Sequence, residues 1–141
     1  MKNRAWGVAL FFIAVSALAA MPSDNGNAIV YVYRPHRFTA AAKNPSIYVD
    51  GREISRLHNG TYLKFEVAPG QHSLTSASYV EGDPFESFQA GREYFFRLQT
   101  GSWVKGAVGR AEMKLLAVPK EQGTVEIEKL KEGRVAQPSK P

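Results

Sequence analysis

Three dipeptides at regular spacing, Asp50-Gly51, Asn59-Gly60 and Pro69-Gly70, constrain the fold of this chain more than any other feature. Asp-Gly and Asn-Gly favour two-residue turns that need positive backbone φ, and such turns join the strands of a hairpin. Around them lie runs of β-branched and aromatic residues, of which Ile29–Tyr33 is the clearest. Residues of this kind suit a pleated sheet surface. The sequence therefore predicts a chain of short strands joined by tight turns.

About seven short strands are expected, at close and fairly regular spacing. In the segment Tyr62–Val67, apolar Leu63, Phe65 and Val67 alternate with more polar neighbours, which is the period of a strand with one buried face. A further hairpin is expected at Ala90-Gly91. Eight segments are candidates for these strands: 29–33, 47–49, 52–56, 62–67, 72–78, 85–89, 93–99 and 113–118. This pattern favours a mainly β fold, a small antiparallel β-sandwich.

The period changes after Lys120. Val125, Ile127 and Leu130 are separated by charged residues and fit one short amphipathic helix at the C-terminal end of the domain. Gly133 stands where such a helix would end. Gly123 lowers the helix propensity of the same segment.

The N-terminus has the three parts of a secretory signal peptide. Lys2 and Arg4 precede an uncharged run from Ala5 to Ala17, and Ala17-Leu18-Ala19 is a small-x-small cleavage site. The alternative is a retained membrane anchor, but the apolar run is shorter than the roughly 20 residues that span a bilayer. We expect a signal at 1–19, a flexible leader at 20–27, one domain at 28–132 and a disordered tail at 133–141.

The chain contains no cysteine. A lipoprotein signal requires a cysteine after the cleavage site, so the predicted export leaves no lipid anchor and no stable membrane attachment. Disulfides, thiolate metal sites and thiol catalysis are excluded as well. The formal net charge is +5 and is dispersed along the sequence, whereas a nucleic-acid interface needs clustered basic residues. A nucleic-acid partner is therefore not expected.

No catalytic motif is present. The sequence has neither a Gly-x-Ser-x-Gly elbow nor a phosphate-binding glycine loop, and His36, His58 and His72 are widely spaced. His72 is expected to hold a turn through a side-chain hydrogen bond. We predict no catalytic residue, no metal and no cofactor. The alternative is a hydrolase or metal-dependent enzyme whose site is assembled from scattered side chains, with candidates at His36, His58, His72, Asp50, Asp83 and Glu86.

The acidic residues near the turns allow two interpretations. Asp50 and Asp83 could pair with Glu53 or Glu81 as acid and base, but Asp before Gly or Pro is also a turn residue for local hydrogen-bonding reasons. Asn59-Gly60-Thr61 fits the glycosylation acceptor pattern, and a hairpin turn explains the same residues without modification.

Aromatic and arginine residues near the first strand are the better functional indication. Rings and guanidinium groups together are typical of binding surfaces. The alternative is that the tyrosines complete the core with their hydroxyls at its edge. The candidate binding residues are Tyr31, Tyr33, Arg34, Arg37, Phe38 and Trp103.

Several short motifs, in this order and spacing, resemble the DUF2846 family of bacterial exported proteins. They are AIVYVYRP at 28–35, IYVDG at 47–51, LHNGTY at 57–62, VAPGQHSL at 67–74, GREYF at 91–95 and GTVE at 123–126. The central motifs are also similar to PEGA-type β modules. The resemblance implies a small β-sandwich in a bacterial envelope compartment, and it brings no established activity. Many relatives look like lipoproteins, from which this chain departs.

Together these features favour an exported, non-enzymatic protein of the periplasm or cell envelope. Its expected role is that of a binding module with an envelope protein or glycan partner. A structural accessory without a ligand pocket is the second interpretation, and the scattered-site enzyme is the third.

Overall fold

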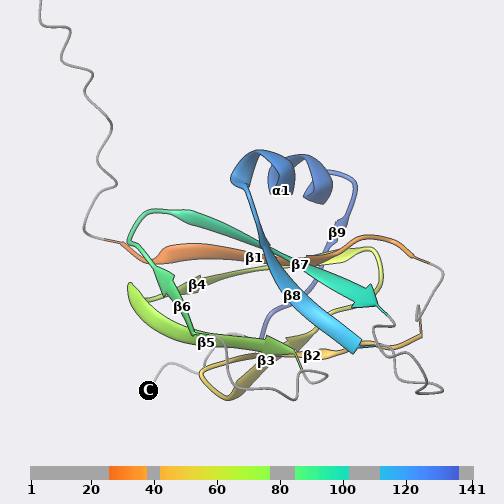
Figure 1. Cartoon of the computed structure of the whole chain (residues 1–141), viewed down its shortest axis with the longest axis horizontal. Helices are drawn as coiled ribbons and strands as arrows, with labels where there is room; N and C mark the ends of the chain where they lie inside the picture. Colours follow the sequence, from red (N-terminus) through yellow and green to blue (C-terminus); the bar gives the residue numbers. More distant parts are fainter. Residues whose placement is uncertain (1–25, 38–41, 77–84, 102–111, 137–141) are drawn as a thin grey trace, which may run out of the picture.

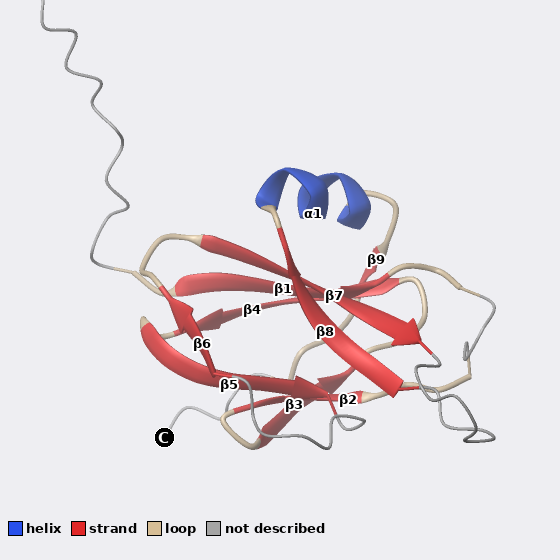
Figure 2. Ribbon diagram, viewed as in Figure 1, coloured by secondary structure: helices blue, strands red, loops and turns tan. Residues whose placement is uncertain are grey.

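Within the residues that the computed structural model describes, nine strands form two facing sheets, and one helix, α1 (Lys120–Ile127), lies on the outer side of the larger sheet (Figure 1). The described residues are 26–37, 42–76, 85–101 and 112–136. The predicted signal segment therefore lies outside the described residues. Figure 2 shows the three layers in order: helix, larger sheet and smaller sheet. The predicted mainly β sandwich with one short helix is confirmed.

The two sheets differ in size and in the direction of their strands. The larger sheet has the order β8-β7-β1-β4-β9, formed by Glu112–Val118, Glu93–Gly101, Ala28–Arg34, Thr61–Val67 and Lys131–Glu132. The smaller sheet has the order β3-β2-β5-β6, formed by Arg52–Arg56, Ser46–Val49, Gly70–Ser76 and Phe85–Phe88. The smaller sheet is antiparallel, as predicted. In the larger sheet, however, β1 runs parallel to β7 and β9 runs parallel to β4.

One of the three predicted hairpins is present. Asp50-Gly51 joins the paired strands β2 and β3, with φ of 50° at Asp50 and 77° at Gly51, as a primed turn requires. The Asn59-Gly60 hairpin is wrong because β3 and β4 belong to different sheets. The Ala90-Gly91 hairpin is wrong for the same reason, since β6 and β7 also lie in different sheets. These two turns carry the chain from one layer to the other.

The core lies between the sheets. Along β1, Val30 and Val32 are fully buried on the inner face, and Tyr31 and Tyr33 point to the outer face, as strand alternation dictates. The core residues come from both layers: Ala28, Val30, Val32, Ile47, Leu57, Leu63, Val67, Leu74, Phe88, Phe96, Leu98 and Met113.

Helix α1 packs on the larger sheet through a glycine. Gly123 is buried, and a Cβ atom at that position would lie 2.4 Å from the ring of Phe95 on β7. The predicted helix is confirmed, but its apolar face is not the predicted one, because Val125 is 56% exposed. The predicted helix also ends too late: α1 stops at Ile127, and Lys131–Glu132 forms β9.

The chain stays in contact with the domain beyond residue 132. The Gly133 N–H donates to the Tyr62 carbonyl at 2.7 Å, and the Ala136 N–H donates to the Ile54 carbonyl on β3 at 2.9 Å. Residues 133–136 thus run from the edge of the larger sheet to the edge of the smaller one. Of the predicted tail, only 137–141 lies outside the described residues. Within the described ranges, no helix has the length and apolar character needed to cross a membrane.

Candidate functional site

The outer face of the larger sheet carries three half-buried or exposed side chains beside α1, Tyr31, Tyr62 and Lys64, which we call the outer aromatic patch. The Tyr31 ring stacks on buried Phe95 with centroids 4.6 Å apart and an interplanar angle of 5°. On its other side lie the Tyr62 ring, tilted at 6.4 Å, and the Lys64 ammonium, 5.7 Å from the Tyr31 centroid. Adjacent strands β1 and β4 hold these groups in register, with Tyr31 opposite Lys64.

Charged groups surround the patch in pairs. The Glu93 carboxylate forms an ion pair with the Lys120 ammonium of α1 and accepts a hydrogen bond from the Tyr31 hydroxyl at 3.4 Å. The hydrogen bond from Lys120 holds the pKa of Glu93 below its ordinary value, against the effect of partial burial. The Tyr62 hydroxyl lies 3.4 Å from a Glu132 carboxylate oxygen on β9. The patch is therefore a fixed arrangement of rings, with ionised groups at its border.

Tyr33 belongs to the interface between the helix and the sheet. Its side chain is fully buried, and its hydroxyl donates to a Glu126 carboxylate oxygen of α1 at 2.8 Å. The Arg97 guanidinium donates to the other oxygen of the same carboxylate at 3.3 Å. Burial, reinforced by the neighbouring carboxylate, raises the pKa of Tyr33 well above its ordinary range. Burial alone would raise the pKa of Glu126, but its hydrogen bonds outweigh that effect and the net shift is downward. The alternative sequence interpretation, a tyrosine with its hydroxyl at the edge of a packed core, holds for this residue.

Arg34 is also buried. It is 2% exposed, and its guanidinium donates to the Lys43 carbonyl, which anchors the connection from β1 to β2. Burial lowers the pKa of Arg34. The sequence placed Tyr33 and Arg34 in the binding surface, and their burial removes both from it. Arg37 is exposed, whereas Phe38 and Trp103 lie outside the described residues.

Asn59, in the turn between β3 and β4, holds the loop that follows β1. Its side-chain oxygen accepts the Arg37 N–H at 3.0 Å, and its side-chain nitrogen donates to the Arg37 carbonyl at 2.8 Å. His36 lies against Gly60, the next residue, where a Cβ would sit 3.2 Å from its ring. The Asn59 amide therefore acts as a backbone mimic that fastens the loop after β1.

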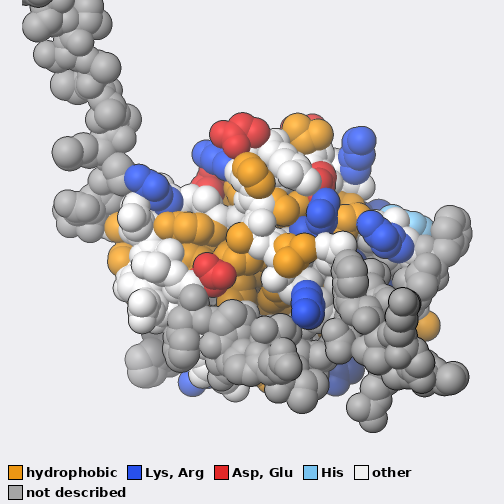
Figure 3. Space-filling model, in the orientation of Figure 1, with side chains coloured by type: hydrophobic (Ala, Val, Ile, Leu, Met, Phe, Trp, Pro, Cys, Tyr) orange, Lys and Arg blue, Asp and Glu red, His pale blue; other side chains and the backbone are white. Residues whose placement is uncertain are grey.

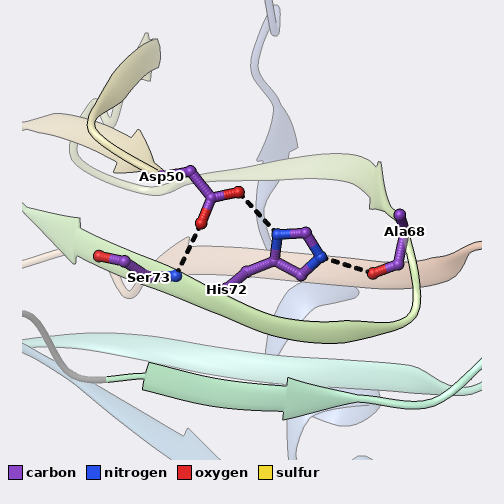
Figure 4. A network of polar contacts seen from close by, with 4 residues as sticks. All are labelled: Asp50, Ala68, His72 and Ser73. Carbon is purple, nitrogen blue, oxygen red and sulfur yellow. Dashed lines mark hydrogen bonds and ion pairs between the residues drawn. The ribbon is translucent and has the colours of Figure 1, made fainter.

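Asp50 and His72 form the most constrained polar cluster (Figure 4). The Asp50 carboxylate accepts the Ser73 N–H at 2.9 Å and lies 2.6 Å from His72 Nδ1. His72 Nε2 lies 2.7 Å from the Ala68 carbonyl. Both ring nitrogens thus face oxygen acceptors, an arrangement that satisfies both only when the imidazole carries two protons. The hydrogen bond to Asp50 raises the pKa of His72, and the same bond lowers the pKa of Asp50.

This cluster fulfils the role predicted for His72, because it ties the turn after β4 to the hairpin turn between β2 and β3. Of the six scattered candidates for an enzyme site, Asp50 and His72 come together. Glu86 lies opposite His72 in the ladder of β5 and β6, and Asp83 is outside the described residues. Among the residues with described positions, no group of three or more His, Asp or Glu side chains is arranged to hold a metal ion.

Sequence reasoning missed two members of the outer aromatic patch. Tyr62 and Lys64 were visible only as the polar side of an alternating strand. Their proximity to Tyr31 follows from the β1–β4 register, for which the Asn-Gly turn gave no indication because it does not join paired strands.

The comparison with protein families agrees with the motifs quoted above. The family model described as "Protein of unknown function (DUF2846)" matches residues 24–110. Neither a curated protein nor a solved structure matches this chain. The match ends before β8, although β8, α1 and β9 pack onto the matched strands in one domain. Because the match spans more than half of the 141 residues, the chain belongs to the DUF2846 family.

Proposed function

We propose that this protein is an exported, non-catalytic module of the cell envelope that binds another envelope protein through the outer aromatic patch. The observation that carries the proposal is the Tyr31–Tyr62–Lys64 arrangement, left partly exposed beside α1. Aromatic residues are enriched in protein interfaces because they bury large areas at low entropic cost. The stack on Phe95 fixes the Tyr31 ring before any partner arrives.

A protein partner fits the patch better than a glycan does. Sugars are recognised by aromatic rings through an open ring face. One face of Tyr31 is occupied by Phe95, and Lys64 and Tyr62 crowd the ring as well. What Tyr31 offers is a ring edge and a hydroxyl, next to an exposed ammonium. These groups suit the mixed polar and apolar surface of a folded protein.

The contacts of His72 support a non-catalytic role. A general base needs a ring nitrogen that can take a proton from a substrate. Both nitrogens of His72 already face acceptors, so the Asp50–His72 pair has the geometry of a structural tie. A nucleic-acid partner is disfavoured by the dispersed charge. On the face seen in Figure 3, the Lys and Arg side chains are spread out instead of forming one patch.

The role of the patch predicts a specific loss of binding. Replacing Tyr31 and Tyr62 with Ala together removes both rings, and capture of a partner from envelope extract should weaken at least about tenfold. Tyr48→Ala is the matched control, because Tyr48 is half-buried on the smaller sheet. Quantitative pull-down with the three proteins, each checked for folding by circular dichroism, measures the effect. Equal capture by the wild type and the double variant would reject the patch. Retention on peptidoglycan or polysaccharide alone would replace the protein partner with a glycan.

Export predicts a defined N-terminus. The protein isolated from the envelope fraction should begin near residue 20, after cleavage at Ala19. Ala19→Phe should block cleavage and leave the signal attached, because the peptidase requires small residues at both outer positions of the small-x-small site. Leu18→Phe, at the tolerant middle position, is the control. Intact-mass measurement distinguishes the products, and wild-type protein that retains residues 1–19 would favour the membrane-anchor alternative.

A further inference from the structure

A second surface feature lies on the opposite side of β4 from the outer aromatic patch. A cleft of about 530 Å³ opens where the β2–β3 hairpin faces the end of β4, and Val135 and Ala136 line it as well. Its size falls within the range of about 300 to 1,000 Å³ that is usual for small-molecule sites. Residues of both sheets line it, from β2 and β3 of the smaller sheet and from β4 of the larger one.

The inner wall of this cleft is apolar. Val49, Ile54, Phe65 and Val135 are partly buried and pack against the core cluster, and Val67 of that cluster also lines the cleft. Ile54 has no partner on β2, since Ile47 pairs with Ser55 and Tyr48 with Glu53. Such a bulge re-aims the side chains of an edge strand and is frequent beside binding sites. An apolar chain that entered here would displace water from side chains already in contact with the core.

The charges at the rim are not equivalent. Each of its three carboxylates already has a donor. Asp50 has His72 and Ser73, Glu53 has Ser46 at 3.0 Å and Arg56 at 3.7 Å, and Glu66 has Asn27 at 3.2 Å.

Arg52 differs from them. It is exposed, lines the same cleft two residues before Ile54, and makes no hydrogen bond or ion pair with any residue that the structure describes. Its guanidinium is therefore the rim charge available to a ligand.

We propose that this cleft binds a single-chain amphiphile, with its apolar chain against Ile54, Phe65 and Val135 and its anionic head on Arg52. A guanidinium presents a planar set of donors that matches a carboxylate or phosphate group. The site is separate from the outer aromatic patch and does not depend on it. Tyr31→Ala should therefore leave amphiphile binding unchanged.

Dodecanoate is the probe, used below its micelle concentration and titrated into the full-length protein by calorimetry. We expect saturable binding of one dodecanoate per chain. Arg52→Gln should weaken it about tenfold, since a charge-assisted hydrogen bond is lost. Arg92→Gln, which changes an exposed arginine outside the cleft, should have no effect. Dodecanol and dodecyltrimethylammonium, which share the apolar chain, should bind more weakly than dodecanoate.

A filling variant tests the position of the chain. Ala136 is exposed and lines the cleft, so Ala136→Trp should block the mouth and abolish dodecanoate binding while the melting temperature is kept. If this variant fails to fold, Arg52→Gln still decides the question. Three results would overturn the proposal: no saturable binding, equal affinity of wild type and Arg52→Gln, or equal affinity for the three probes. Retention on anionic phospholipid vesicles without binding of monomeric dodecanoate would also overturn it.

Discussion

Gly123→Ala should destabilise the protein by about 1 to 3 kcal/mol, although the same change inside an exposed helix would stabilise it. The higher helix propensity of Ala is outweighed because the new Cβ would lie 2.4 Å from the Phe95 ring. At that distance either the helix or the ring must move. Movement of α1 also disturbs the Tyr33–Glu126 hydrogen bond that holds it to β1. Urea unfolding followed by circular dichroism measures the change in the free energy of unfolding.

Truncation of the ring gives the decisive control. In a Phe95→Ala background, the space left by the ring accepts the Cβ, and Gly123→Ala should then stabilise by up to about 1 kcal/mol through helix propensity alone. Val125→Ala, at the exposed position of the same helix, should change stability by less than about 0.5 kcal/mol. A stabilising effect of Gly123→Ala in the wild-type background would show that Phe95 does not limit the approach of α1.

Asp50→Asn should cost about 1 kcal/mol of stability near neutral pH. Asn keeps the turn, because it tolerates the positive φ of residue 50 as well as Asp does. The Asn side-chain oxygen can still accept the Ser73 N–H, so the substitution isolates the loss of the negative charge that faces His72. The expected value is modest because the Asp50 side chain is about half exposed, and water screens the pair.

The cost should depend on pH. The raised pKa of His72 means that its contribution is complete below the ordinary value of 6.5 and disappears as the pH rises through the higher folded value. The lowered pKa of Asp50 means that its contribution is complete above 3.8 and disappears as the pH falls through the lower folded value. The stability difference between wild type and Asp50→Asn should therefore be largest between these limits and shrink on either side. A difference that stays constant from pH 3 to pH 9 (roughly the range of the titrations) would contradict the ion pair. His58→Asn, which removes an exposed histidine, is the control.

The sequence predicted turns and side-chain hydrogen bonds correctly where they depend on residues that are close in the chain. Asp50-Gly51 predicted a primed turn and His72 predicted a turn-holding hydrogen bond, and both are present. Asn59-Gly60 and Ala90-Gly91 predicted hairpins that do not exist. A turn motif specifies backbone angles over a few residues, but it does not specify which sheet the next strand joins.

The sequence did not predict which of the candidate site residues are buried and which are exposed in the folded domain. Tyr31 and Tyr33 have the same strand parity and the same side chain, yet α1 covers only Tyr33 and leaves Tyr31 at the surface. From the sequence, Gly123 indicated only a lower helix propensity. Its packing against Phe95 could not be predicted, because the two residues are distant in the chain and meet only in the folded domain.

The parallel pairings of the larger sheet have a consequence for how the domain is made. β1 is the first strand to be synthesised, but its parallel partner β7 follows only after five other strands. The Glu132 carboxylate that accepts the Tyr62 hydroxyl is synthesised 70 residues after Tyr62. A topology dominated by such distant pairings has a high contact order and folds on a scale of roughly milliseconds to seconds. The core between the sheets is not complete until β8 has been synthesised, because Met113 of β8 belongs to it. Until β4 follows, β1 has no partner strand in its sheet.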